Sequence, residues 1–143
     1  MKISKINDTD YKIYYYKDNI NKDCLYDRIR DIIKSIQKRL KLKGFYKVVV
    51  FCKKIGLFIQ LIYVDDNLYK NILDLKIEII DDDVYFKTSD YFVIKDLSNI
   101  RYFNNMYYVL VNDDFDRVLD RIEFGEFLFG YDVLEIIDKT YVI

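Results

Sequence analysis

Runs of aspartate are the residues of this sequence whose type and spacing come closest to a chemical site. They occur at Asp65-Asp66, Asp81-Asp82-Asp83 and Asp113-Asp114-Phe115-Asp116. Carboxylate oxygens are ligands that suit Ca²⁺ and Mg²⁺, but the last run, counted from Asp113, lacks the glycine and the glutamate that an EF-hand loop requires. Turns and helix caps account better for all three runs. We therefore expect no metal site and no cofactor.

The residue pairs that many enzymes use for nucleophilic catalysis are missing. The chain has no histidine, which excludes Ser-His and Cys-His pairs. Its glycines form neither a phosphate-binding loop nor a dinucleotide-binding motif. A metal-dependent nuclease built on Asp74, Lys76 and Glu78 remains an alternative, although their spacing is not specific for one. We predict that the protein is not an enzyme.

Charged residues are sorted by position along the chain. Residues 1–60 hold 15 Lys/Arg and 6 Asp/Glu, a net charge of +9, whereas residues 61–143 hold 8 and 18, a net charge of −10. The overall charge of −1 therefore conceals two opposed halves. Such a distribution governs which partners a protein meets and how fast, rather than its fold.

Two charged segments are candidate partner-binding sites. The first is a basic face formed by Arg28, Lys34, Lys38, Arg39 and Lys41. The second is an acidic segment formed by Asp113, Asp114, Asp116, Asp120, Glu123 and Glu126. The basic face suits a phosphate backbone or an acidic protein surface. A solvated helix face without a partner, or one that complements the acidic half of the same molecule, is the other interpretation.

An amphipathic helix over residues 24–43 is expected to carry the basic face. Its apolar residues recur at steps of three and four, which is the period of a helix with one buried side. Asp23 is available as the N-cap, and Gly44 stands just past the end as a C-terminal stop. A second helix is expected around Phe115 to Ile122, capped by Asn112 or Asp113, and a last short one over residues 132–138.

Most other segments predict strands. Residues 11–16 form a first strand, and residues 45–52 and 57–64 form a hairpin with Gly56 in its turn. Further hairpins are expected around Asp81-Asp82-Asp83, joining residues 75–80 to 84–87, and around Asn104-Asn105-Met106, joining residues 101–103 to 107–111. Residues 91–94 are expected to form a short strand, and the segment from Glu126 to Gly130 an irregular turn.

These elements predict a single α+β domain over residues 1–143. We expect a mainly antiparallel sheet, one long N-terminal amphipathic helix at about 24–43 and short C-terminal helices. The sequence has neither the apolar run of a signal peptide nor a stretch of about 20 apolar residues. Cys24 and Cys52 are expected to be free thiols. Together these features predict a cytoplasmic protein that does not bind membranes.

Several segments resemble known proteins. The segments at 44–61, 73–79, 89–94, 102–111 and 122–130 together resemble a family of small uncharacterised cytosolic proteins from low-G+C Firmicutes. That resemblance implies a bacterial cytosolic protein, with no activity or catalytic residue to carry over. The opening MKISKIN, the strand YYVLV and the motif EFGE are also similar to MecA-type adaptors, which deliver client proteins to a Clp ATPase.

The prediction for function is an intracellular protein-binding domain, acting as an adaptor, an inhibitor or an assembly factor, or associating with itself. Its 15 tyrosines agree with this, because alternate residues of a strand face opposite sides and some rings must be exposed. One alternative is a nucleic-acid-binding accessory protein that uses the basic helix. Another is a phage-type inhibitor whose acidic half mimics nucleic acid. No single motif in the sequence decides among them.

Overall fold

The computed structural model describes residues 1–16, 22–65, 72–111 and 116–143. The chain divides into two compact units. Unit 1 comprises Met1–Cys52 and Gly56–Ile80, and unit 2 comprises Lys53–Ile55 and Asp81–Ile143. The expectation of one domain over residues 1–143 stays a prediction, because two compact units on one chain can still unfold together.

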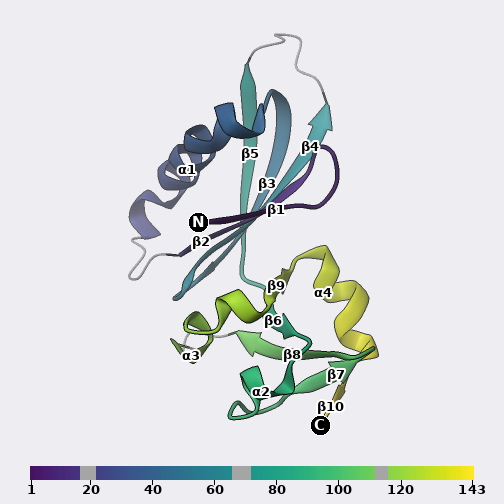
Figure 1. Ribbon diagram of the computed structural model, residues 1–143. Helices are drawn as coiled ribbons and strands as arrows, with labels where there is room; N and C mark the ends of the chain where they lie inside the picture. The colour runs from purple at the N-terminus through teal and green to yellow at the C-terminus, as the bar shows by residue number, and fades with distance from the viewer. Residues whose placement is uncertain (17–21, 66–71, 112–115) are drawn as a thin grey trace. The chain divides into compact units, whose positions relative to one another are not determined.

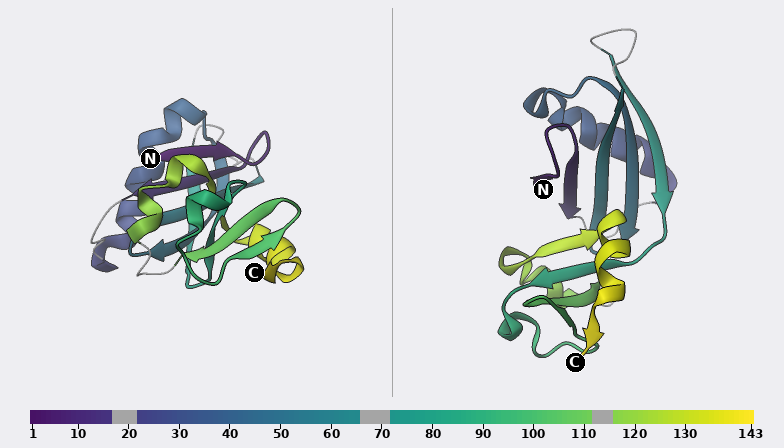
Figure 2. Two further views of the ribbon diagram at one scale, coloured as in Figure 1. Left: turned by 60° about the horizontal axis from the view of Figure 1, so that its bottom comes forward. Right: turned by 90° about the vertical axis from the view of Figure 1, so that its right-hand side faces the viewer.

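Unit 1 is a five-stranded sheet with one helix along a face (Figures 1 and 2). The strand order is β1-β2-β4-β3-β5. The strands are β1 (Lys2–Lys5), β2 (Tyr11–Tyr16), β3 (Gly44–Lys53), β4 (Gly56–Asp65) and β5 (Leu73–Ile80). The helix α1 spans Leu25–Leu40 and follows a 3₁₀ turn at Lys22–Cys24. β1 and β4 pair antiparallel with β2, whereas β5 pairs parallel with β3.

The core of unit 1 lies between α1 and the sheet. The helix contributes Leu25, Ile29, Ile32, Ile33 and Ile36, all buried, and its remaining side is polar. The sheet contributes alternate residues of its strands, because successive side chains point to opposite faces. These include Ile13 on β2, Tyr46, Val48 and Val50 on β3, and Leu57, Ile59 and Leu61 on β4.

The helix differs from the sequence prediction in its position and its ends. It follows two strands and is therefore not the N-terminal element, and it spans Leu25–Leu40 rather than 24–43. Cys24, not Asp23, is the N-cap, and its side chain makes no cap hydrogen bond. At the other end Lys41 adopts the left-handed conformation (φ 55°). Gly44 is already the first residue of β3.

The early end of α1 has a packing reason. Leu42 is buried in the core, so the chain must turn back before it. The N–H of Leu42 donates to the carbonyl of Gln37 (3.0 Å) and that of Lys41 to the carbonyl of Lys38 (3.3 Å). This pair of bonds is a Schellman motif, in which one left-handed residue ends the helix. Burial of Leu42 places that residue at Lys41, where the sequence shows no glycine.

Unit 2 is a second five-stranded sheet, with strand order β10-β7-β8-β6-β9. Its strands are β6 (Val84–Thr88), β7 (Arg101–Phe103), β8 (Met106–Val111), β9 (Glu126–Phe129) and β10 (Tyr141–Val142). All four neighbouring pairs are antiparallel. The helices are short: α2 (Tyr91–Ile94), α3 (Asp116–Leu119) and α4 (Tyr131–Ile136), with 3₁₀ turns at Ile122–Phe124 and Ile137–Lys139. The fold is therefore mixed α and β with mostly antiparallel sheets, as predicted.

A core cluster of unit 2 lies between its sheet and α4. Tyr85, Tyr108 and Leu128 are buried there. Val133 and Ile136 of α4 pack against this cluster. On the opposite face of the same strands, the rings of Phe86 and Phe127 meet edge to face, 5.7 Å apart between centroids. Both faces of this sheet thus bury apolar side chains.

The hairpin expected around Asp81-Asp82-Asp83 does not form. β5 pairs with β3 in unit 1, and β6 pairs with β8 and β9 in unit 2. The three aspartates are exposed and connect the two units along the chain. Turn-forming residues allow a hairpin without requiring one, and each strand here finds a partner that is more distant in sequence.

Two further local predictions were wrong, and one hairpin is confirmed. Residues 91–94 form α2 instead of a strand, because the Asp90 side chain accepts a hydrogen bond from the Phe92 N–H (3.0 Å) and caps a helix. Residues 126–129 form β9 instead of an irregular turn. The β7–β8 hairpin is confirmed, and its turn residues Asn104 and Asn105 both have positive φ, 52° and 66°.

Candidate functional site

The basic face predicted from the sequence lies on α1 and the residue after it. Lys34, Lys38, Arg39 and Lys41 are exposed, and Arg28 is half-buried. None of the five forms an ion pair with another residue in the described parts of the chain. Within the described parts of the chain, these five side chains are therefore not held by an ion pair.

The helix period divides the four cations of this face that lie on α1 between two sides. Lys34 and Lys38 are one turn apart and share the side opposite the buried stripe, whereas Lys41 follows the helix in a left-handed conformation and lies outside its period. Arg28 and Arg39 are separated by three full turns and share a flank. The N-terminal half of α1 also carries exposed Asp27 and Asp31. Uncompensated positive charge is concentrated in the C-terminal half.

A structural role explains part of this placement. Lys38 and Arg39 lie in the last turn of α1, where the helix dipole is negative. A cation in that position typically contributes about 0.3–1 kcal/mol to helix stability. Lys34 lies further from the helix end, and Lys41 is outside the last helical turn. The dipole alone therefore does not account for the whole basic surface.

A pocket of about 280 Å³ opens beside the C-terminal end of α1. Three tyrosine rings line it, from Tyr11 of β2, Tyr46 of β3 and Tyr63 of β4. Leu40, Lys41, Lys43, Asp8 and Thr9 complete its wall. The rings of Tyr46 and Tyr63 meet edge to face with centroids 5.5 Å apart. Tyrosine and lysine residues thus line the same hollow.

Hydrogen bonds fix the wall of this pocket. The Asn7 side-chain oxygen accepts from the N–H groups of Thr9 and Asp10, both at 2.9 Å. Asp10 in turn accepts from the Tyr63 N–H (2.9 Å), which ties the β1–β2 turn to β4. Burial, and then the proximity of Tyr11 and Asp10, raises the pKa of Tyr46. Its phenol group therefore stays protonated at neutral pH and can donate a hydrogen bond.

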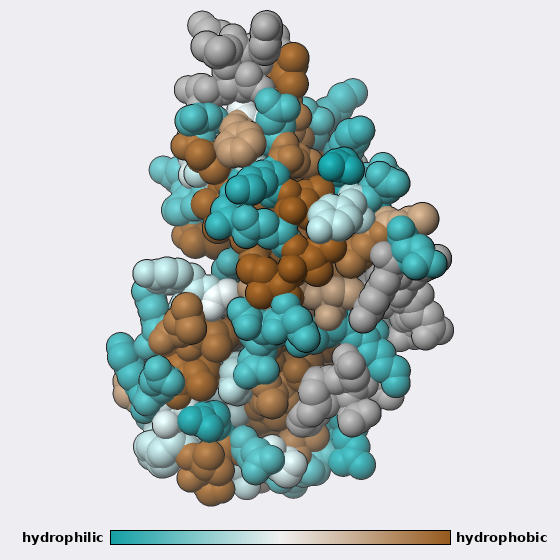
Figure 3. Space-filling model, turned by 180° about the vertical axis from the view of Figure 1, so that it is seen from behind, coloured by the Kyte–Doolittle hydropathy of each residue, from teal (hydrophilic) through white to brown (hydrophobic). Residues whose placement is uncertain are grey.

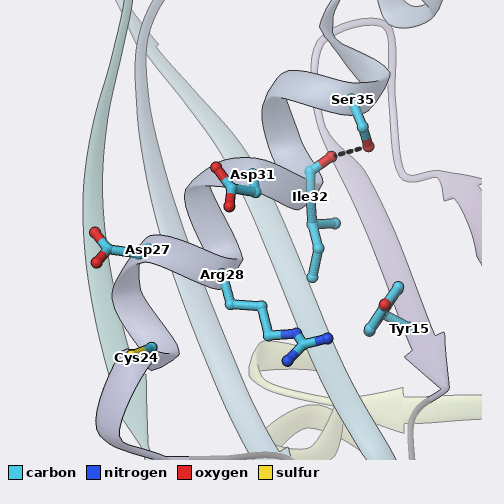
Figure 4. A pocket seen from close by; sticks show the side chains of 7 residues that line it. All are labelled: Tyr15, Cys24, Asp27, Arg28, Asp31, Ile32 and Ser35. Carbon is cyan, nitrogen blue, oxygen red and sulfur yellow. Dashed lines mark hydrogen bonds between the residues drawn. The ribbon is translucent and has the colours of Figure 1, made fainter.

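A second pocket, of about 480 Å³, lies near the N-terminal end of α1 (Figure 4). Its lining residues are Tyr15, Cys24, Asp27, Arg28, Asp31, Ile32 and Ser35. The Arg28 side chain extends from the helix toward Tyr15 of β2, whereas Asp27 and Asp31 point away from both (Figure 4). Ser35 donates to the Ile32 carbonyl (2.5 Å). Arg28 therefore lines a hollow instead of adding to the exposed lysine surface.

The acidic segment is less uniform than the sequence suggested. Asp113 and Asp114 lie outside the described residues, and Asp116 is the first residue of α3. Asp120 and Glu123 are exposed. Glu126, on β9, pairs with Lys87 of β6 at 3.4 Å.

Two cations also interrupt this segment. Arg117 and Arg121 both pair with Asp96, at 3.6 Å and 2.7 Å. Hydrogen bonds from Arg121 lower the pKa of Asp96 to about 2. The acidic segment therefore combines exposed carboxylates with structural ion pairs.

The two units nevertheless carry opposite net charges. Unit 1 holds 15 Lys/Arg and 10 Asp/Glu, a net charge of +5, and unit 2 holds 8 and 14, a net charge of −6. Within unit 1, Glu78 on β5 lies between Lys47 (3.6 Å) and Lys76 (3.8 Å). Some of the positive charge of unit 1 is thus neutralised by ion pairs on the sheet. The lysines of α1 take no part in these pairs.

Aromatic residues form a row in unit 2 that the sequence did not indicate. Tyr91 of α2 contacts Tyr107, Tyr107 contacts Tyr102, and Tyr102 contacts Tyr141, with ring centroids 5.0–5.6 Å apart. The Phe92 ring, beside Tyr91, is 74% exposed, and the Lys95 ammonium lies 5.1 Å from it. Residues 91, 107 and 141 lie far apart in sequence, and the packing of α2 together with the pairing of β10 with β7 brings them into this row.

Among the described residues no group of three or more His, Cys, Asp or Glu side chains is placed to hold a metal ion. Neither cysteine forms a disulfide: Cys24 is exposed and Cys52 is half-buried. The described residues include no helix long and apolar enough to cross a membrane.

Comparison with known proteins identifies no relative: no family model, curated protein or solved structure matches the chain. The surface of α1 and the pockets beside it are therefore the features that bear on function.

Proposed function

We propose that this protein is a non-enzymatic protein-binding domain that presents the C-terminal half of α1 to an acidic surface of its partner. The observation that supports this most is the group Lys34, Lys38, Arg39 and Lys41, which is exposed and makes no ion pair with a described residue. Such a surface attracts an oppositely charged protein over distances comparable to the Debye length, about 8 Å at physiological ionic strength.

The tyrosine pocket is a second observation in favour of this surface as the binding site. Stable protein contacts centre on buried anchor residues in pockets, with charged residues around them. The pocket beside Lys41 has aromatic walls and two lysines at its rim. It is small, so it suits one inserted side chain of a partner better than a larger ligand. Lysine charge would orient the partner, and the pocket would hold it.

The proposal includes a role as adaptor, inhibitor or assembly factor in the cytoplasm. Two cysteines that form no disulfide support a reducing compartment. Nucleic acid is the competing partner, since exposed lysines beside tyrosine rings also suit a phosphate backbone with stacked bases. The net charge of −1 and the negative unit 2 argue for a protein.

An affinity capture with matched charge variants tests the proposal. The bait is the whole chain, with and without nuclease treatment of the lysate. The variant K38E/R39E/K41E reverses the basic surface, and K5E/K95E/K139E makes the same change of charge at exposed lysines elsewhere. We expect a nuclease-resistant protein that is lost with the first variant and kept with the second. Loss upon nuclease treatment would point to nucleic acid, and equal capture by both variants would contradict the proposal.

A further inference from the structure

Strand β5 is a long edge of the sheet in unit 1. It is last in the strand order and pairs with β3 on one side only among the described strands. The register between β5 and β3 is continuous from Leu73 to Ile80, so no bulge interrupts it. The chain contains no proline. Long edges without bulges or prolines are prone to pair with a further strand.

The direction of the backbone groups of β5 follows from one hydrogen bond. The Gly44 N–H donates to the carbonyl of Ile72 (3.2 Å), so the backbone of residue 72 faces β3. Backbone groups of successive residues in a strand alternate between its two sides. The N–H and C=O groups of Leu73, Leu75, Ile77 and Ile79 therefore point away from β3, toward the outer edge.

We propose that two copies of this chain pair through β5, antiparallel and centred on Ile77, and so join their two sheets into one. In this register Ile77 faces Ile77 of the second copy, and Leu75 faces its Ile79. All of these residues have outward backbone groups, as hydrogen-bonded antiparallel pairs require. A twofold contact of this kind is self-complementary and closes after two copies.

The charged residues of β5 favour this register over the neighbouring ones. Between the hydrogen-bonded pairs, Lys76 of one copy lies opposite Glu78 of the other, twice by symmetry. Non-hydrogen-bonded antiparallel pairs bring their side chains closest, and like charges there are unfavourable. Moving the centre to residue 76 or 78 would oppose Lys76 to Lys76 or Glu78 to Glu78. The charges on this edge therefore disfavour those two registers and favour the one centred on Ile77.

One other register also matches charges, and it overlaps less of the strand. Centred on Leu75, it opposes Lys76 to Asp74 but pairs only residues 73–77 of the strand. The register centred on Ile77 pairs residues 74–80. Both registers pair three outward residues and so form the same number of backbone hydrogen bonds, but the longer overlap places more side chains opposite one another and is therefore the more stable one.

The apolar residues of β5 also favour a contact that covers this edge. Leu75, Ile77 and Ile79 pack against the core of unit 1 but remain half-buried. In the proposed pair they meet their counterparts and extend the core across the contact. Figure 3, seen from the β5 side, shows hydrophobic residues among the charged ones there. The contact uses neither the lysines of α1 nor the tyrosine pocket.

Sedimentation velocity on the purified chain tests this inference. We expect a reversible species of twice the 17.4 kDa chain mass, with a concentration-dependent share of single chains. K76E and E78K each place two like-charged pairs across the contact, and we expect about a tenfold weaker association from either. A wild-type chain that remains single at several hundred micromolar would overturn the proposal.

The same two variants supply a control within one experiment. In a mixture of K76E with E78K, each mixed pair again has opposite charges facing each other at positions 76 and 78. The mixture should therefore pair about as strongly as the wild type, and so should the double variant K76E/E78K. Circular dichroism checks that each variant is folded. Mixed samples that stay as single chains, or single variants that pair like the wild type, would refute the register.

Discussion

At the scale of single residues, the positively charged side chains of α1 differ in their surroundings. Arg30 is paired with Asp27, and Arg28 extends into a pocket toward Tyr15. Lys34, Lys38, Arg39 and Lys41 remain exposed without an ion pair to a described residue. The sequence prediction placed Arg28 on one face with these four residues. Only their surroundings show which of them a partner can reach.

Among the described carboxylates, Asp96 is the one whose pKa is most clearly changed by its neighbours. It accepts hydrogen bonds from both terminal nitrogens of Arg121 (2.7 and 2.9 Å), and Arg121 also donates to the Val93 carbonyl (3.0 Å). These bonds tie the residues just after α3 to the region of α2. They lower the pKa of Asp96 to about 2, below its usual value of 3.8.

This shift predicts a pH dependence of stability. A lowered pKa in the folded state means that the ionised carboxylate stabilises the fold above the unfolded pKa, and that this contribution is lost as the pH falls from about 4 to about 2. We expect D96N to remove this part of the acid dependence, whereas D138N should retain it. Urea denaturation between pH 2 and 6 measures both, and an unchanged slope in D96N would contradict the assignment.

At the scale of elements, the end of α1 shows how packing overrides local signals. A glycine at 44 suggested a later stop, but burial of Leu42 requires the turn at Lys41. A left-handed conformation costs a residue with a Cβ about 1–2 kcal/mol. The backbone conformation of Lys41 is therefore unfavourable for a residue with a Cβ. Lys41 lines the tyrosine pocket, where its charge contributes to the proposed contact.

The cost at Lys41 can be measured by substitution. We expect K41G to be more stable than K41A by about 1 kcal/mol, because glycine adopts the left-handed conformation without strain. Both variants lose the same charge, so their difference isolates the backbone term. Urea denaturation gives the two free energies of unfolding. Equal values would mean that Lys41 is not held in that conformation in solution.

At the scale of the whole molecule, the two units have opposite net charges, and Asp81-Asp82-Asp83 follow the last residue of unit 1, Ile80, where the main segment of unit 2 begins. The three aspartates are exposed and belong to no described strand. Inserting Gly-Ser-Gly-Ser between Asp82 and Asp83 should therefore change the free energy of unfolding by less than about 1 kcal/mol, since lengthening a loop costs little entropy.

The same insertion between Val109 and Leu110, inside β8, should unfold unit 2, because it breaks the pairing with the central strand β6. Circular dichroism during urea unfolding follows both variants. A single transition in the wild type would support the predicted single domain. Loss of structure upon insertion at Asp82 would show that the aspartates have a role in packing.

The sequence by itself determined the features that depend on near neighbours. Apolar spacing placed α1 to within a few residues, and Asn104 and Asn105, which tolerate positive φ, specified the β7–β8 turn. Exclusion of histidine chemistry also needed only the residue list. The positions of the basic residues on α1 followed from the same helical period.

Only the tertiary structure decided which distant segments meet. β5 and β6 flank a run of turn-forming aspartates, yet each pairs elsewhere, because strand propensity does not specify a partner. Tyr11, Tyr46 and Tyr63 surround one pocket beside Lys41 only after β2, β3 and β4 have joined a sheet. Strand pairing and core burial depend on long-range contacts, which a local pattern cannot encode alone.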